Sequence, residues 1–192
     1  MAGDARRTPF EKNVAALEAL QPDTAERLRA TPLDATIAPF ASRDGTPGVV
    51  YRPPDATSPY HLHSRYRPWV EAERAAATIE ETATLVVAGA GGVFLPRLIV
   101  AQRPSVAVIV TERNAETLRS VFSAVDLTEM IRSRRVRFVT APEELAAVVP
   151  TVHQPAIRDG VTIDEVATWT RLPENRARFA AYGEELTRVL RD

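Results

Sequence analysis

The sequence predicts an α/β fold, a Rossmann-like parallel sheet preceded by a small extension of helices and antiparallel strands. Strand-like and helix-like segments alternate after residue 67, and the first of these strands is apolar throughout, as a strand buried on both faces should be. A glycine turn follows that strand directly. This β-α-β-α-β order implies a parallel sheet with right-handed crossovers. We therefore assign residues 1–66 to the extension and residues 67–192 to a Rossmann-like domain with a C-terminal helix.

The extension opens with the pattern of an amphipathic helix. Apolar residues recur at helical spacing over Phe10–Leu20, and a shorter helix over residues 25–30 follows a turn at Pro22. Three short strands come next, and the first contains a proline, which is tolerated at an edge or a bulge. The strands are expected at Thr36–Phe40, Val49–Tyr51 and Tyr60–His63.

The Rossmann-like part begins with a helix at Pro68, where the missing N–H of proline does no harm. The buried stripe of this helix is predicted to be Trp69, Ala72, Ala76 and Ile79. Strands are expected at Leu85–Ala88, Val106–Val110 and Val136–Val139. Helices are expected after the glycine turn, after a cap at Asn114, from Pro142 and over Pro173–Leu190, with a loop over Thr151–Gly160.

Composition narrows the class of protein. The chain has 192 residues, 45% of them hydrophobic, which is enough for one domain with a core and a small appendage. The formal net charge of −1 gives no overall field toward nucleic acid or acidic lipid. The absence of cysteine excludes disulfides and cysteine-based zinc sites. We expect a soluble, cytoplasmic protein with no nucleic-acid or membrane partner, and its oligomeric state stays open.

The strongest candidate site is the first strand, turn and helix of the Rossmann-like part. Glycines in Gly89-Ala90-Gly91-Gly92 let a phosphate or carboxylate approach the backbone, and the next helix offers free N–H groups. Glu112 ends the following strand roughly twenty residues later, where such folds place an acid that accepts bonds from ribose hydroxyls. The pattern favours a nucleotide-like ligand over a tight turn beside a solvated acid. A sugar nucleotide and S-adenosylmethionine are the candidate cofactors.

The sequence departs from two known cofactor-binding motifs, so the class of cofactor stays open. A nicotinamide-type fingerprint requires a third glycine near Leu95, and a methyltransferase usually carries an acid where Val87 stands. The chain also has no phosphate loop ending in Gly-Lys-Ser/Thr, which argues against ATP hydrolysis.

Other polar groups are weaker candidates. His61 and His63 alternate along the predicted strand and so point to one side, but without a third ligand a hydrogen-bonding role is favoured over metal binding. His153 has no evident partner acid, and we assign neither a catalytic residue nor a metal site. A basic cluster is interpreted as a solvated helix end and strand edge rather than a phosphate site; it comprises Arg132, Arg134, Arg135 and Arg137.

Two segments resemble a known family. Tyr60–Arg74 is similar to the Leu-His-Ser-Lys-Tyr-Asp-Pro motif, followed by Glu-Ala-Glu-Arg, of the bacterial motility-associated factor family, the flagellin-modifying glycosyltransferase-like proteins. Phe10–Asn13 resembles the first helix of that family, and Glu112 with Asn114 matches its acid after the second strand. The resemblance covers nearly the whole chain. It adds Asn114 to the predicted ligand site of Gly89, Ala90, Gly91, Gly92 and Glu112.

The resemblance implies a role in protein glycosylation. Members of the family are longer, and their transferase region follows the segment that this chain matches, so we expect this chain to correspond to their N-terminal part. Such a domain would bind a nucleotide-like ligand or a protein partner such as flagellin. Two alternatives remain: a small methyltransferase that uses S-adenosylmethionine, motivated by the glycine turn and Glu112, and a non-catalytic interaction module, motivated by the lack of an evident acid–base pair.

Overall fold

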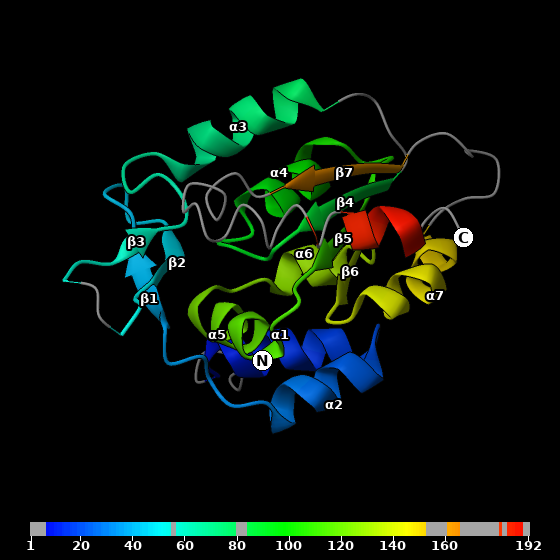
Figure 1. The fold of residues 1–192 in the computed structure, drawn as a ribbon, viewed down its shortest axis with the longest axis horizontal. Coiled ribbons are helices and arrows are strands. Elements are labelled where there is room, and N and C mark those ends of the chain that lie inside the picture. Colours follow the sequence, from blue (N-terminus) through cyan, green and yellow to red (C-terminus); the bar gives the residue numbers. More distant parts are fainter. Residues whose placement is uncertain are drawn as a thin grey trace.

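The computed structural model describes residues 7–54, 57–79, 84–152, 161–165, 181 and 184–189. It contains a four-stranded parallel sheet with the order β6-β5-β4-β7 and a three-stranded antiparallel sheet with the order β1-β2-β3 (Figure 1). The parallel strands are β4 (Thr84–Ala88), β5 (Ala107–Thr111), β6 (Val136–Val139) and β7 (Val161–Glu165). The predicted fold class, a Rossmann-like α/β fold with a helical and antiparallel extension, is confirmed.

The central position of β4 explains its apolar sequence. β4 pairs in parallel with β5, where Val86 lies opposite Ile109, and with β7, where Val86 lies opposite Ile163. Leu85 and Val87 face the larger hydrophobic core, whereas Val86 and Ala88 face a second core on the other side of the sheet. A strand with apolar cores on both faces is expected to be almost continuously apolar, as Leu85–Ala88 are after Thr84.

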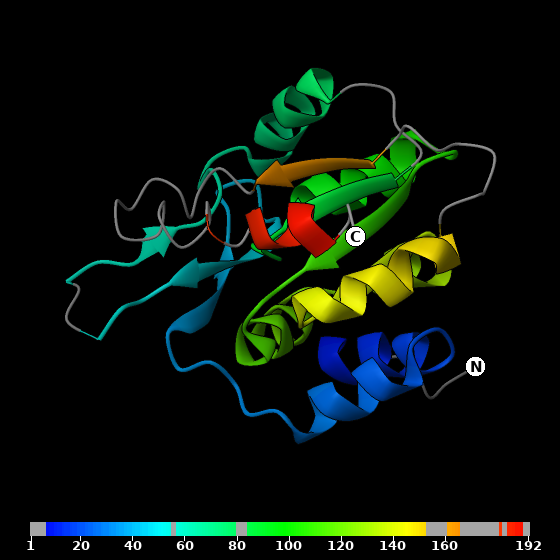
Figure 2. The same cartoon turned by 45° about the vertical axis from the view of Figure 1, so that its right-hand side comes forward.

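Helices cover both faces of the parallel sheet. The larger core includes residues of α4 (Phe94–Gln102), α5 (Ala115–Ala124) and α6 (Thr128–Arg132). The second core includes Leu145 of α7 (Pro142–Val152) and Leu186 of the helical segment 184–189. Figure 2 shows α7 and this C-terminal segment together on one side of the sheet.

The boundaries of several predicted elements change. The helix α7 continues through Val152, so the loop predicted from Thr151 is wrong at its first two residues. The rest of that loop, and with it His153, lies outside the described residues. Residues 184–189 agree with part of the predicted C-terminal helix, whose other residues are outside the described part except for Ala181. The strand β7 and the short helix α6 were not predicted from the sequence.

The extension matches the predicted order of elements. It consists of α1 (Pro9–Glu18), α2 (Pro22–Ala30), β1 (Ile37–Ala41), β2 (Pro47–Tyr51) and β3 (Tyr60–His61), and α3 (Pro68–Thr78) follows. Thr8 and Glu11 form a capping box at the start of α1, which satisfies backbone donors that a helix leaves free. The strand predicted over Tyr60–His63 ends at His61. No helix in the described part of the chain is long and apolar enough to cross a membrane.

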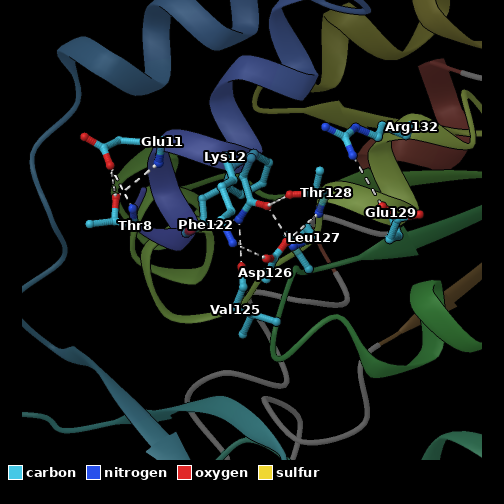
Figure 3. A network of polar contacts seen from close by, with 11 residues as sticks. Thr8, Glu11, Lys12, Phe122, Val125, Asp126, Leu127, Thr128, Glu129 and Arg132 are labelled. Atoms are coloured by element: carbon cyan, nitrogen blue, oxygen red, sulfur yellow. Dashed lines mark hydrogen bonds and ion pairs between the residues drawn. The ribbon is translucent and has the colours of Figure 1, made fainter. Parts of the chain in front are cut away.

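A buried asparagine joins the first helix to the Rossmann-like part. Asn13 is fully buried, and its Nδ2 donates to Phe122 O (2.9 Å) and Val125 O (2.7 Å). Its Oδ1 accepts from Leu127 N at 2.7 Å. These partners lie at the end of α5 and just before α6, as Figure 3 shows. One amide side chain thus satisfies three backbone groups that would otherwise be buried without partners.

Candidate functional site

The glycine turn leaves β4 through a backbone that only certain residues adopt easily. Gly89 and Gly91 have φ angles of 88° and 46°, in the region that favours glycine. Gly89 N donates to Thr111 O at 2.7 Å, which ties the turn to the end of β5. The turn is buried, with Ala90 only 1% exposed. Its N–H groups therefore need hydrogen-bond partners within a closed environment.

Glu112 accepts one hydrogen bond from the turn and a second from the backbone just after its own strand. Its Oε2 accepts from Ala90 N at 3.0 Å, and its Oε1 accepts from Asn114 N at 3.1 Å. Only 8% of this residue is exposed. Burial raises the pKa of the Glu112 carboxyl, and the two backbone N–H donors oppose that shift. The structure thus brings Glu112, Ala90 and Asn114 together, and they bond to one another.

Asn114 has a second role at the start of α5. Its Oδ1 accepts from Glu116 N (2.9 Å) and Thr117 N (3.4 Å), which is the predicted N-cap. Both the backbone and the side chain of Asn114 are therefore used within the fold.

A histidine from the extension bonds to the last glycine of the turn. His63 Nε2 accepts from Gly92 N at 2.8 Å, so the lone pair of this nitrogen points at the turn. His63 Nδ1 lies 3.3 Å from Glu71 Oε1 and carries the ring hydrogen in this arrangement. Glu71 Oε2 in turn accepts from Ser64 N at 2.7 Å. The chain of contacts from Glu71 through His63 to Gly92 fixes the imidazole over the turn.

Aromatic packing explains the glycine at position 92. A Cβ atom there would lie 2.4 Å from Phe94 Cε2 and 2.9 Å from His63 Cδ2. The Phe94 ring makes edge contacts with His63, at 4.9 Å between centroids, and with Trp69, at 5.2 Å. Side chains of the protein itself occupy the space that the absent Gly92 side chain leaves.

The two histidines predicted to lie on one side of a strand, His61 and His63, pack against different aromatic residues in the structure. The strand β3 ends at His61, and the His61 ring packs against Phe40 (4.6 Å between centroids) while His63 faces Phe94. Because the strand is shorter than predicted, the expectation that both imidazoles point to one side of it does not apply. Among the described residues, no cluster of three or more His, Cys, Asp or Glu side chains could hold a metal ion.

The arginine cluster serves mainly structural roles. Arg135 donates to the carbonyl oxygens of Val100, Arg103 (2.9 Å) and Val106 (3.2 Å), around the end of α4. Positive charge at the C-terminus of a helix complements its dipole. Arg132 and Arg134 are exposed, as the interpretation of a solvated helix end predicts.

No protein-family model and no curated protein matches the sequence. The fold is similar to that of the MAf glycosyltransferase from Magnetospirillum magneticum AMB-1, with a TM-score of 0.59 and 15% sequence identity. The match covers 94% of this chain but only 35% of the transferase chain. The two proteins therefore share a fold over this region.

Sequence reasoning did not anticipate that His63, Glu71 and Phe94 close the turn. A partial signal was present, because His63 and Glu71 both lie within the motif-like segment Tyr60–Arg74. Neither the strand predicted at Tyr60–His63 nor the helix predicted from Pro68 accounts for a pair of polar residues eight positions apart. Polar residues that local structure does not explain are candidates for long-range contacts.

Proposed function

We propose that this chain is an N-terminal, Rossmann-like domain of the motility-associated factor type, and that it supports protein glycosylation by binding a partner without transferring sugar itself. The fold shared with the MAf glycosyltransferase over 94% of the chain supports this proposal. The resemblance of Tyr60–Arg74 to the family motif supports it independently. Flagellin is the protein partner that the resemblance suggests.

The observation that favours partner binding over nucleotide chemistry at the glycine turn is that groups of the protein itself occupy most of the turn. Phosphate groups bind at such turns through free backbone N–H groups next to a space without side chains. Here Ala90 N bonds to Glu112, Gly92 N bonds to His63, and the Phe94 ring fills the space beside the turn. A ligand at this place must replace contacts that the protein already makes.

Nucleotide binding at Gly89–Gly92, Glu112 and Asn114 stays a prediction. It requires a ligand that displaces His63 and shares the Glu112 carboxylate with Ala90 N. The methyltransferase hypothesis likewise stays a prediction: Glu112 accepts two backbone N–H groups, and its carboxylate keeps further lone pairs that ribose hydroxyls would have to share.

Binding to flagellin tests the proposed role directly. Biolayer interferometry with immobilised flagellin from the same organism should give saturable binding of the purified chain. Intact-mass measurement of flagellin incubated with the chain and sugar nucleotides should show no added sugar. An unrelated protein of similar size and charge serves as the negative control. A mass increase with this chain alone, or binding no stronger than that of the control, would overturn the proposal.

Amide hydrogen exchange tests the closure of the turn. In the free protein, the N–H groups of Ala90 and Gly92 should exchange slowly, and millimolar sugar nucleotide or S-adenosylmethionine should leave their rates unchanged. His63→Ala should accelerate exchange at Gly92, whereas the neighbouring variant His61→Ala should not. Fast exchange at both amides in the free protein would show that the turn is open to ligands.

A further inference from the structure

The motif-like segment has a second set of side chains that the glycine turn does not use. His63 and Ser64 contact Glu71, whereas other residues of the segment line a separate cavity of about 310 Å³ on the small sheet. The residues that line this cavity are Phe40, Ala41, Arg43, His61, Arg65 and Tyr66. Its volume lies within the range of pockets that hold small ligands.

Two guanidinium groups converge on one exposed aromatic ring in this cavity. The Cζ atoms of Arg43 and Arg65 lie 5.9 Å and 4.8 Å from the centroid of the Tyr66 ring. Arg43 N donates to Arg65 O at 2.9 Å, which fixes the spacing of the two residues through the backbone. In the part of the chain that the structure describes, neither arginine forms an ion pair.

Asp44, the acidic residue next to Arg43 in the sequence, forms its hydrogen bonds within the β1–β2 hairpin. Asp44 Oδ1 accepts from Ser42 Oγ and from Thr46 N, both within the hairpin between β1 and β2. These hydrogen bonds lower the pKa of the Asp44 carboxyl. The Asp44 carboxylate therefore makes its hydrogen bonds within the hairpin.

His61 adds an unsatisfied polar atom to the same wall. Its ring packs edge-on against Phe40, and its Nδ1 is buried without a hydrogen-bond partner among the described residues. Burial, and to a smaller degree the charge of Arg65, lowers the pKa of the His61 imidazole, so the ring is neutral near pH 7. A neutral ring beside Phe40 provides a surface for a flat ligand group.

We propose that this cavity binds a small ligand in which a phosphate group is joined to a ring, with a mononucleotide as the representative compound. The phosphate lies between Arg43 and Arg65, because guanidinium groups bind phosphate through paired, charge-assisted hydrogen bonds. The ring lies against Phe40 and His61, because aromatic side chains stack on bases. This inference does not depend on the proposed role in glycosylation, and each can fail without the other.

Calorimetric titration tests the site. The probes are uridine and adenosine monophosphates, compared with the matching nucleosides and with inorganic phosphate. Both nucleotides should bind, more weakly at high salt, and the single-component probes should bind at least about tenfold more weakly. The double variant Arg43→Ala/Arg65→Ala should lose about tenfold or more in affinity. Arg74→Ala, an exposed arginine on α3, should bind like the wild type. Circular dichroism verifies that each variant is folded.

Amide chemical shifts locate the bound nucleotide. Changes should centre on Arg43 and Tyr66 and leave Ala90 and Gly92 unaffected. Changes centred on the glycine turn, or equal affinity of the double variant and the wild type, would overturn the assignment. Equal binding of inorganic phosphate and nucleotide would refute a role for the aromatic wall. The absence of binding by every nucleotide at millimolar concentration would refute the site itself.

Discussion

Glu112→Ala removes a buried carboxylate that two backbone groups use as their acceptor, Ala90 N at 3.0 Å and Asn114 N at 3.1 Å. A hydrogen bond to a charged group stabilises by about 1.5–3 kcal/mol, so the two bonds together contribute about 3–6 kcal/mol. Relief of the carboxylate's desolvation, which amounts to several kcal/mol for a buried ion, offsets part of this loss. We expect a net decrease of about 1–3 kcal/mol in the free energy of unfolding.

The effect of Glu112 on stability should also depend on pH. Burial raises the pKa of Glu112 in the folded protein above its ordinary value, so the folded state binds the proton more tightly than the unfolded state. The stabilisation from this proton is complete below the unfolded pKa and is lost as the pH rises through the folded pKa. Glu112→Gln carries no titrating group, so its stability relative to wild type should increase as the pH rises through that window.

Urea unfolding from about pH 5 to about pH 8 measures both effects. Glu73→Gln, an exposed glutamate on α3, is the matched control and should show neither the loss nor the pH trend. The reasoning is refuted if Glu112→Ala unfolds at the wild-type urea concentration. If the folded variant also weakens nucleotide binding at the glycine turn, the carboxylate serves a ligand as well as the turn.

Three further substitutions and one control, Gly45→Ala, test the packing around the turn and the helices by the same unfolding measurement. Gly92→Ala should cost about 1–3 kcal/mol, because its Cβ would clash with Phe94. Gly45→Ala, where φ is 82° but no atom lies within 4 Å, should cost only the backbone strain of about 1 kcal/mol; an equal or larger effect there would contradict the steric argument. Asn13→Ala should cost about 2–4 kcal/mol, because it leaves buried backbone groups without partners; a change below about 0.5 kcal/mol would contradict this. Arg135→Ala should cost about 1–3 kcal/mol by exposing the carbonyl oxygens at the end of α4, and wild-type stability would show that water replaces the guanidinium.

Much of the fold could be predicted because its strongest signals are local. The apolar run of β4 reflects burial on both faces of the sheet. Asn114 marks the start of α5 because its side-chain oxygen caps the helix. The strand β7 gave no comparable signal, because Val161–Glu165 is short, contains three polar residues and lies at the sheet edge. The helix α6 has only five residues, too few for a hydrophobic period to be recognised.

The candidate site could be predicted only in part, for a related reason. The meeting of the glycine turn with Glu112 follows from strand order, since the carboxyl ends of neighbouring parallel strands lie together. The approach of His63 to Gly92 depends on how the small sheet and α3 pack against α4, and no periodicity in the sequence encodes that packing. The sequence therefore predicts which residues surround the turn on its own sheet, and it does not predict that His63, from the loop after β3, bonds to the turn.

The hydrogen bond from Gly92 N to His63 joins the extension to the Rossmann-like unit. It also supplies an acceptor that a buried N–H group of that unit needs. A buried glycine turn has N–H groups that must be bonded, and a Rossmann unit that binds a dinucleotide leaves some of them for the ligand. In this chain the fold itself supplies acceptors for three of these groups. Thr111 O and Glu112, at the end of β5, accept from Gly89 N and Ala90 N. His63, which follows β3 and contacts Glu71 of α3, accepts from Gly92 N. Removing the His63 ring would therefore leave the buried N–H group of Gly92 without an acceptor. The stability of that unit and the conformation of the motif-like segment should consequently change together, and a His63→Ala variant that alters exchange in both regions would demonstrate the coupling.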